Sequence, residues 1–221
     1  MTKAKAALVG ADGLKARLKA TAEQLPEPSR VRIHRAISWL NRAEAESTDH
    51  DARFIFLWVA FNAAYAQEFG FEKTERDQLR GFLDKLQSVD GEGTLHQLVF
   101  DKFSGPVRML IENKYVFEPF WRALRDHDRS ERWKERFEKE NKSAFKAVMG
   151  KDTVAVLGVV FDRLYVLRNQ LVHGGATWNS KVNRQQVRDG AAMLHLLLPA
   201  MIGLMLDHPG LELGAISFPV I

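Results

Sequence analysis

Hydrophobic side chains along this 221-residue chain recur mainly at the three- and four-residue spacing of an α-helix. Residues 14–25 and 29–46 each carry such a stripe, and the Pro26-Glu-Pro28 break separates them. The next segment, RFIFLWVAFNAAYAQEF at 53–69, is apolar on all sides apart from Asn62 in its interior. A helix of that kind belongs at the centre of a bundle.

The same spacing predicts helices through the middle of the chain. Residues 75–88 are amphipathic, and residues 94–103 are predicted to run as a helix up to Gly105-Pro106. The segment 118–146 is highly charged but keeps aromatic residues at helical spacing. That combination predicts a solvated amphipathic element rather than a disordered tail.

Two long apolar helices are predicted towards the end of the chain, at 152–172 and 184–207. Asn183, followed three residues later by Gln186, predicts a capping box at the start of the second. No segment shows sustained alternation of apolar and polar residues, and only the C-terminal ISFPVI resembles a short strand. The pattern therefore predicts an all-α protein.

The predicted architecture is an up-and-down bundle of four to five core helices. Residues 28–221 are expected to form a single helical domain with a helical insertion at about 90–150, and residues 1–27 an N-terminal helical extension. A chain of this length suits one domain with a sizeable core.

Composition narrows the classes of function. Lys and Arg number 32 against 28 Asp and Glu, and the resulting net charge of +4 favours a polyanionic partner only weakly. The chain has no cysteine, which excludes disulfides, thiolate nucleophiles and zinc sites with sulfur ligands. Since no His/Asp/Glu ligand set is evident either, we predict no metal and no cofactor.

No apolar run near the start of the sequence is long enough for a signal peptide. The most apolar stretch, Phe54–Ala66, is far shorter than the ~20 residues that a membrane span needs. We therefore expect a cytoplasmic protein with no membrane partner.

The stretch LRNQLVHGG at 167–175 is an unusual end for a helix. The bare pattern Arg-x4-His is weak, because it occurs at 168–173 and again at 122–127. His127 lies in a charged run, whereas His195 lies in an apolar run as a core histidine that one hydrogen bond would satisfy. His173 differs because it stands in the last turn of a long helix, where Gly174-Gly175 supplies the left-handed residue that commonly ends one.

Helical geometry separates two faces of residues 152–172. At ~100° per residue, an arc of about 60° forms a core stripe of Val160, Leu164, Leu167 and Leu171. An arc of about 80° on the opposite side is polar without lysine or glutamate, and comprises Asp162, Tyr165, Asn169 and His173. Because neighbours at i,i+4 can touch, Asn169 is able to hold one ring nitrogen of His173 and fix its tautomer.

A purely structural interpretation is open as well. Histidine in a last helical turn interacts favourably with the helix dipole by about 0.3–1 kcal/mol, and Arg168 would then simply ion-pair with Asp162 or with a neighbouring helix. A functional interpretation must explain why Arg168 and His173 lie ~140° apart around the helix. Either the helix opens before His173, or the two residues meet across a symmetric dimer.

Three segments in the same order resemble the HEPN superfamily of small helical-bundle proteins. Arg168-Asn169-x-x-x-His173 matches the signature of that superfamily: an arginine, a polar residue, a short spacer and a histidine. FIFLWVAFNAAY at 54–65 is similar to the earlier core helix of these proteins, and ATWNSKVNRQQVRDGA at 176–191 to the segment after the motif in many bacterial members. The resemblance spans roughly residues 30–207 and is poorest at 90–150.

The resemblance implies a metal-independent endoribonuclease that acts as a homodimer with the motif at the interface. Such enzymes are often toxins paired with an antitoxin protein, or effectors of phage defence. Cleavage by 2′-hydroxyl attack would leave a 2′,3′-cyclic phosphate, with His173 as general base or acid and Arg168 as the clamp on the phosphoryl oxygens. Asn169 would orient His173 or the scissile phosphate, and Tyr165 and Asp162 are weaker supporting candidates.

Other polar residues carry two interpretations each. Asn62 is a further candidate to reach the site, but a buried amide that bonds to a backbone carbonyl is the preferred interpretation of it. The arginines of the charged segment, Arg122, Arg125 and Arg129 with Arg132 and Arg136, are candidates to hold the RNA backbone. The alternative for them is a solvated helix laced with ion pairs to Glu131, Glu135 and Glu138.

Two other functions compete with the ribonuclease. One is a non-catalytic HEPN-type module that binds RNA, a nucleotide or a protein partner. The other is a structural or regulatory bundle in which the motif only ends a helix.

Overall fold

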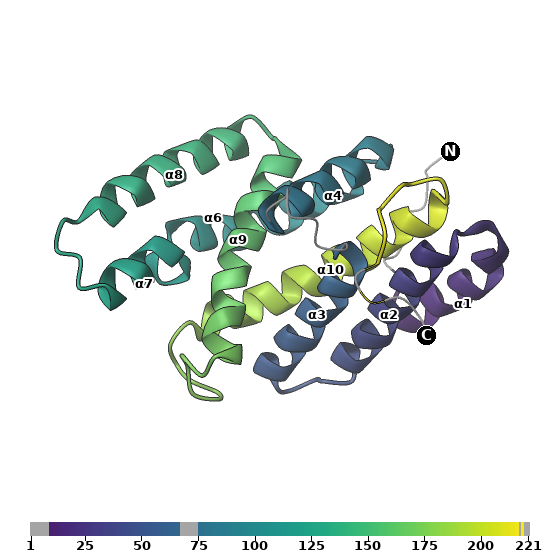
Figure 1. Cartoon of the computed structure of the whole chain (residues 1–221), viewed down its shortest axis with the longest axis horizontal. Helices are drawn as coiled ribbons and strands as arrows, with labels where there is room; N and C mark the ends of the chain where they lie inside the picture. Colours follow the sequence, from purple (N-terminus) through teal and green to yellow (C-terminus); the bar gives the residue numbers. More distant parts are fainter. Residues whose placement is uncertain (1–8, 67–74, 217, 219–221) are drawn as a thin grey trace.

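The computed structural model describes residues 9–66, 75–216 and 218, and every regular element in these residues is a helix (Figure 1). The all-α bundle predicted from the sequence is confirmed. The α-helices are α1 (Ala11–Thr21), α2 (Glu27–Glu44), α3 (His50–Tyr65), α4 (Glu75–Val89), α5 (Thr94–Gln97), α6 (Ser104–Glu112), α7 (Glu118–Arg125), α8 (Arg132–Met149), α9 (Thr153–Val172) and α10 (Arg184–Asp207). Single turns η1 (Ala22–Gln24) and η3 (Lys114–Val116) are 3-10 helices, and η2 (Leu98–Lys102) is a π-helix.

Local sequence signals account for the starts of α3 and α9. The Asp49 side chain accepts hydrogen bonds from the N–H groups of Asp51 and Ala52 at the start of α3, both at 3.0 Å. Asp152 does the same for Ala155 at the start of α9, also at 3.0 Å. These side chains satisfy amide groups that have no acceptor within the helix.

Three expectations about helix and strand limits are wrong or lie outside the described residues. Asn183 precedes α10, but its φ is +54° and its side chain caps nothing, so the capping box is absent. The helix predicted at 94–103 is present as α5 and η2 and ends at Lys102, but Pro106 does not end it; Pro106 lies in the first turn of α6, where a missing N–H costs no hydrogen bond. Of the proposed C-terminal strand, Ile216 and Phe218 are not in a strand, and the remaining residues lie outside the described ones.

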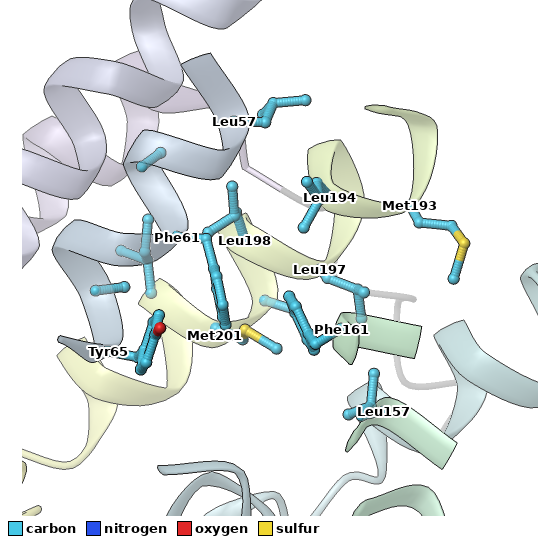
Figure 2. Close-up of a cluster of buried hydrophobic side chains, with 14 of the residues drawn as sticks. Leu57, Phe61, Tyr65, Leu157, Phe161, Met193, Leu194, Leu197, Leu198 and Met201 are labelled. Atoms are coloured by element: carbon cyan, nitrogen blue, oxygen red, sulfur yellow. The ribbon is translucent and has the colours of Figure 1, made fainter. Parts of the chain in front are cut away.

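The core is built where α3, α9 and α10 meet. Figure 2 shows Leu57, Phe61 and Tyr65 of α3 turned towards Phe161 of α9 and a row of α10 side chains. The rings of Phe61 and Phe161 stack with their centroids 4.1 Å apart and their planes at 13°. The all-round apolar character of α3 therefore reflects the central position predicted for it.

One glycine shows how closely α10 approaches its neighbours. A Cβ atom on Gly190 would lie 2.8 Å from Leu164 of α9 and 2.9 Å from Phe54 of α3. Both distances are shorter than real Cβ contacts, so only a glycine allows this approach without movement.

Helix α9 occupies the middle of the molecule, with α7 and α8 on one side of it and α1, α2 and α3 on the other (Figure 1). It packs against α3, α4, α6, α8 and α10. Its predicted core stripe is confirmed, since Val160, Leu164 and Leu167 are buried and Leu171 is half-buried against the core. Helix α9 is therefore in contact with most of the structure.

A buried arginine ties the second helix to the chain end, which the sequence pattern did not suggest. Arg32 of α2 is fully buried, and burial lowers its pKa to about 10. Its guanidinium donates to five backbone carbonyls, those of Ala64, Ala66, Leu213, Gly214 and Ala215. The charge is thereby solvated by peptide dipoles instead of water.

Among the described helices, α10 has the length and mean hydropathy that a membrane crossing requires, with a window of mean hydropathy 1.6. Within the bundle 72% of that window is buried. Its apolar surface is thus used by the core of this fold.

Candidate functional site

The helix end at the motif is confirmed in its geometry. Helix α9 stops at Val172, and Gly174 adopts a φ of +69°. The N–H of His173 donates to the carbonyl of Asn169 and that of Ala176 to the carbonyl of Gln170, both at 3.0 Å. His173 is the C-cap residue, and its side chain is exposed to solvent.

The half-buried side chain of Arg168 packs against two aromatic rings. Its guanidinium carbon lies 5.1 Å from the ring centroid of Tyr165 and 5.7 Å from that of Trp58. Its Nη1 donates to Oδ1 of Asn169 at 2.8 Å. The ion pair with Asp162 that the structural interpretation allowed is absent, because Asp162 pairs with Nε of Arg76 at 3.0 Å.

Asn169 has a different partner from the one expected. Its Oδ1 accepts from Arg168, and no hydrogen bond joins its side chain to the imidazole of His173. Among the described residues, none hydrogen-bonds to that imidazole. Within one chain, therefore, Asn169 orients the arginine of the motif, and the histidine is free to take a partner from outside.

The loop after His173 is fastened to the start of α3. The indole N–H of Trp178 donates to Asp49 at 2.9 Å, and the backbone N–H of Asn179 donates to Asp51 at 2.7 Å. Arg184 adds two hydrogen bonds of 2.9 Å to the carboxylate of Asp51, which is buried. Bonds from the Ala52 N–H and the Trp178 indole lower the pKa of Asp49.

Gln170 provides a second set of hydrogen bonds that hold the end of α9 to its surroundings. Its Nε2 donates to the carbonyl of Tyr115 at 2.6 Å, and its Oε1 accepts from Nδ2 of Asn183 at 2.8 Å. The side chain of Asn183 thus holds Gln170 instead of capping α10. Sequence reasoning missed Gln170, Asp51 and Arg184 because their partners are far along the chain; only the acidic residues before α3 carried a visible helix-cap signal.

Large apolar side chains close to His173 in the sequence are exposed. Val172 is 54% exposed, Trp178 75% and Val182 63%, and all three lie within ten residues of His173. Exposed apolar surface of this kind commonly marks an interaction site. We call these three residues the apolar rim.

A cavity of about 530 Å³ is lined by residues that include Trp58 and Tyr165, the two rings that contact Arg168, and we call it the Arg163 cleft. Residues of α3, α4, α7, α8 and α9 form its wall. Its apolar lining is Trp58, Phe61, Tyr65, Leu79, Phe117, Pro119, Val159, Phe161, Tyr165 and Val166. Its polar lining is Arg76, Glu118, Arg122, Arg136, Glu140, Asp162, Arg163 and Asn169.

Three of the four arginines in this cleft have a carboxylate partner in the same wall. Arg76 pairs with Asp162 at 3.0 Å, Arg122 with Glu118 at 3.0 Å, and Arg136 with Glu140 at 2.7 Å. Burial raises the pKa of Asp162, while the nearby Arg76 opposes that effect. These three pairs leave Arg163 as the fourth arginine of the wall.

Arg163 is only 4% exposed and has no ion pair with a described residue. Its guanidinium lies over the ring of Phe117, 4.6 Å from the centroid, and Nη2 reaches Oδ1 of Asn141 at a long 3.4 Å. Its Nε is buried without a hydrogen-bond partner. Burial lowers the pKa of Arg163, while the carboxylates of Glu140 and Asp162 in the same wall oppose that effect.

The sequence candidates therefore separate into two groups. Asp162, Tyr165, Asn169 and Arg122 line the Arg163 cleft, whereas Arg168 and His173 do not. Tyr165 takes part in both groups, since it lines the cleft and its ring also contacts the guanidinium of Arg168. The polar stripe drawn from the sequence thus continues from the exposed helix end into the cleft.

The remaining candidates lie away from both places. Arg125 is exposed and 3.7 Å from its neighbour Asp126, and Arg129 is exposed after the end of α7. Neither lines the cleft. Asn62 does not line it either, and its Oδ1 is buried with no hydrogen-bond partner in the described part of the chain. The described residues contain no group of three or more His, Asp or Glu side chains placed to hold a metal.

Comparisons with known proteins add no family. A scan against protein-family models finds no match. Searches of curated proteins and of solved structures find no significant similarity either. The HEPN resemblance rests on the three sequence segments that carry it.

Proposed function

We propose that this protein is a metal-independent endoribonuclease that acts as a homodimer. The observation that carries the proposal is the end of α9, where the imidazole of His173 is free in solvent and the guanidinium of Arg168 is held by Asn169 and two rings. An unengaged proton-transfer group and a pre-oriented permanent cation are the two groups that phosphodiester cleavage needs.

The chemistry follows from these two groups. A neutral imidazole takes the proton of the ribose 2′-hydroxyl, and the resulting oxygen attacks the adjacent phosphorus. The P–O5′ bond breaks as the new P–O2′ bond forms, and the departing O5′ takes a proton from the imidazolium or from water, which leaves a 2′,3′-cyclic phosphate and a 5′-hydroxyl. The guanidinium neutralises the charge that develops on the phosphoryl oxygens. Imidazole titrates near neutral pH, so it is suited to this proton transfer.

The dimer follows from the separation of the two side chains. No contact joins Arg168 to His173 within one chain, and the five-residue step turns them ~140° apart around α9. The apolar rim beside His173 provides surface for a second copy. A two-fold axis near the rim would bring His173 of one protomer beside Arg168 of its partner.

One observation favours the competing function, a non-catalytic module that binds RNA, a nucleotide or a protein. Arg168 already has Asn169 and two aromatic rings as partners, so its guanidinium is engaged before any substrate arrives. A dimer that binds RNA without cutting it would support this alternative.

The direct experiment is cleavage of structured and transfer RNA in the presence of EDTA. We expect internal cuts with 2′,3′-cyclic phosphate ends, and a loss of about 10²–10⁴-fold in rate for His173→Ala. His127→Ala is the matched control, because it removes an exposed histidine of the other Arg-x4-His segment and should leave the rate unchanged. Cutting that persists in the His173→Ala protein would exclude the assignment.

A mixing experiment tests the shared site. Neither His173→Ala nor Arg168→Ala protein should cut RNA alone. When the two are unfolded and refolded together, mixed dimers regain one complete site, and about a quarter of the wild-type activity returns if chains pair at random. If mixing restores nothing while both variants remain dimeric, the two residues do not act across an interface.

A further inference from the structure

We propose that the loop after His173 selects RNA with an unpaired base near the linkage that is cut. The indole of Trp178 stacks on that base, and Lys181 contacts a neighbouring phosphate. The proposal rests on the ribonuclease function proposed above and adds the feature of the RNA that the site reads.

Trp178 is exposed and yet fixed. It is 75% exposed, more than any other tryptophan of the chain, although burial of an indole is strongly favourable. Its Nε1 donates to Oδ2 of Asp49 at 2.9 Å, which holds the polar edge of the ring. Most of the ring surface therefore faces solvent in a fixed position, as a stacking platform for a base requires.

The loop that carries this ring is ordered before any RNA arrives. The N–H of Asn179 donates to Asp51 at 2.7 Å, and Arg184 binds the same carboxylate through two hydrogen bonds. The Nε of Arg184 also donates to the carbonyl of Ser180 at 2.9 Å. Binding to a loop that is already ordered costs little conformational entropy.

The charge of the loop favours a polyanion over a second copy of the chain. Residues 163–188 contain five Lys and Arg residues and no Asp or Glu. Lys181 and Arg188 are exposed and have no ion pair with a described residue. A two-fold axis through this loop would bring these like charges together, whereas an axis closer to Val172 leaves the loop free for RNA.

Only an unpaired nucleotide fits this platform. Bases inside an RNA duplex are paired and stacked on each other, so proteins stack aromatic side chains on bases of loops, bulges and ends. The five-residue separation limits the distance between the Cα atoms of His173 and Trp178 to roughly 18 Å. The base on Trp178 therefore lies within a few nucleotides of the linkage that His173 attacks.

The test is RNA binding by full-length His173→Ala protein, which leaves the RNA uncut, measured by fluorescence anisotropy. The two labelled RNAs are a hairpin with a single-stranded loop and a blunt duplex of the same stem. Adding Trp178→Leu should weaken hairpin binding about tenfold and leave duplex binding unchanged, since one stacked base is lost. Trp39→Leu is the matched control: it makes the same change at an exposed tryptophan of α2 and should change neither affinity.

Lys181→Met should weaken the binding of both RNAs alike, because a phosphate contact does not depend on base pairing. Trp178→Phe keeps a flat ring but removes the N–H that binds Asp49, so it should retain most of the hairpin affinity. An equal loss in Trp178→Phe and Trp178→Leu would assign the effect to the hydrogen bond and overturn the stacking proposal. Unchanged hairpin affinity in Trp178→Leu would overturn it too, as would dissociation of the dimer in that variant.

Should Trp178→Leu fail to fold, quenching of tryptophan emission by the hairpin is the second measurement. We expect the quenching to be smaller in Trp178→Phe, and equal quenching would be contrary. Cleavage by the wild-type chain separates the two proposals. If that chain cuts RNA while Trp178→Leu binds the hairpin normally, only the stacking proposal fails; if Trp178 is needed for binding but no RNA is cut, only the ribonuclease proposal fails.

Discussion

Two arginines on α9, Arg163 and Arg168, lie five residues apart and both rest on aromatic rings. Arg163 faces α7 and α8 and is almost fully buried, with one long hydrogen bond and no counter-ion in the described structure. Arg168 is half-buried near the helix end and has a short hydrogen bond to Asn169. Helix α9 thus carries one buried cation in the wall of the cleft and one half-buried cation near its C-terminal end.

The two regions are also held in place differently. The Arg163 cleft is formed by helices that pack against α9 through aromatic side chains. The helix end at His173 depends instead on polar ties to the loop after it, chiefly Asp51 with Arg184 and Gln170 with Tyr115. Arginines on this fold are thus stabilised in different ways: half-buried Arg184 pairs with the carboxylate of Asp51, whereas buried Arg163 lies over the ring of Phe117 and has no ion pair with a described residue.

Breaking the tie at the helix end should have the largest effect on stability. Arg184→Met leaves the carboxylate of Asp51 buried without its counter-ion, and we expect a loss of about 3–5 kcal/mol in the free energy of unfolding. Urea unfolding measures it. Arg188→Met makes the same change on an exposed position of α10 and should cost less than about 0.5 kcal/mol. Equal losses of unfolding free energy in the two variants would mean that the ion pair between Arg184 and Asp51 does not stabilise the fold.

The same substitution at Arg163, in the cleft, should not lower the free energy of unfolding as Arg184→Met does. Arg163→Met removes a buried charge that has no counter-ion, and we expect the free energy of unfolding to rise by about 1 kcal/mol or stay unchanged. Thermal and urea unfolding are the measurements. A loss above about 2 kcal/mol would show that the contacts with the Phe117 ring already compensate the charge, and the contrast with Arg184 would disappear.

The smallest expected effect is the loss of the contribution of Asp49 to stability at acid pH. Bonds from Ala52 and Trp178 lower the pKa of Asp49 in the folded protein, so its contribution to stability is present at neutral pH. That contribution is lost as the pH falls below about 4, the ordinary value for Asp, and through the lower folded value. The difference in unfolding free energy between wild-type and Asp49→Asn proteins should therefore shrink from pH 6 to pH 3. A constant difference across that range would contradict the assignment.

Prediction from the sequence succeeded where the information was local. The limits of α4, α9 and α10 agree with the predicted ranges to within one residue. The glycine that ends α9 and the buried stripe of Val160, Leu164 and Leu167 were also foreseen. These features follow from helical periodicity and from the backbone preference of glycine, and both act over a few neighbouring residues.

Candidate site residues were foreseen less well. The polar stripe on α9 did indicate which residues face away from the core, and Tyr165 and Asn169 lie beside Arg168 as a result. The expected bond between Asn169 and His173 is absent, and Oδ1 of Asn169 accepts from Arg168 instead. Arg163 was overlooked: it falls between the two predicted faces, and its burial comes from α7 and α8, which lie on a separate segment.

By itself, then, the sequence determined that the chain is helical, where its long helices lie, and that Arg168, Asn169 and His173 stand together at the end of one of them. Only the tertiary structure decided which arginines have carboxylate partners, which remain unpaired, and which loop residues anchor the motif. The reason is physical: helix formation and its termination depend on neighbours along the chain, whereas desolvation and ion pairing depend on what packing brings together from distant segments.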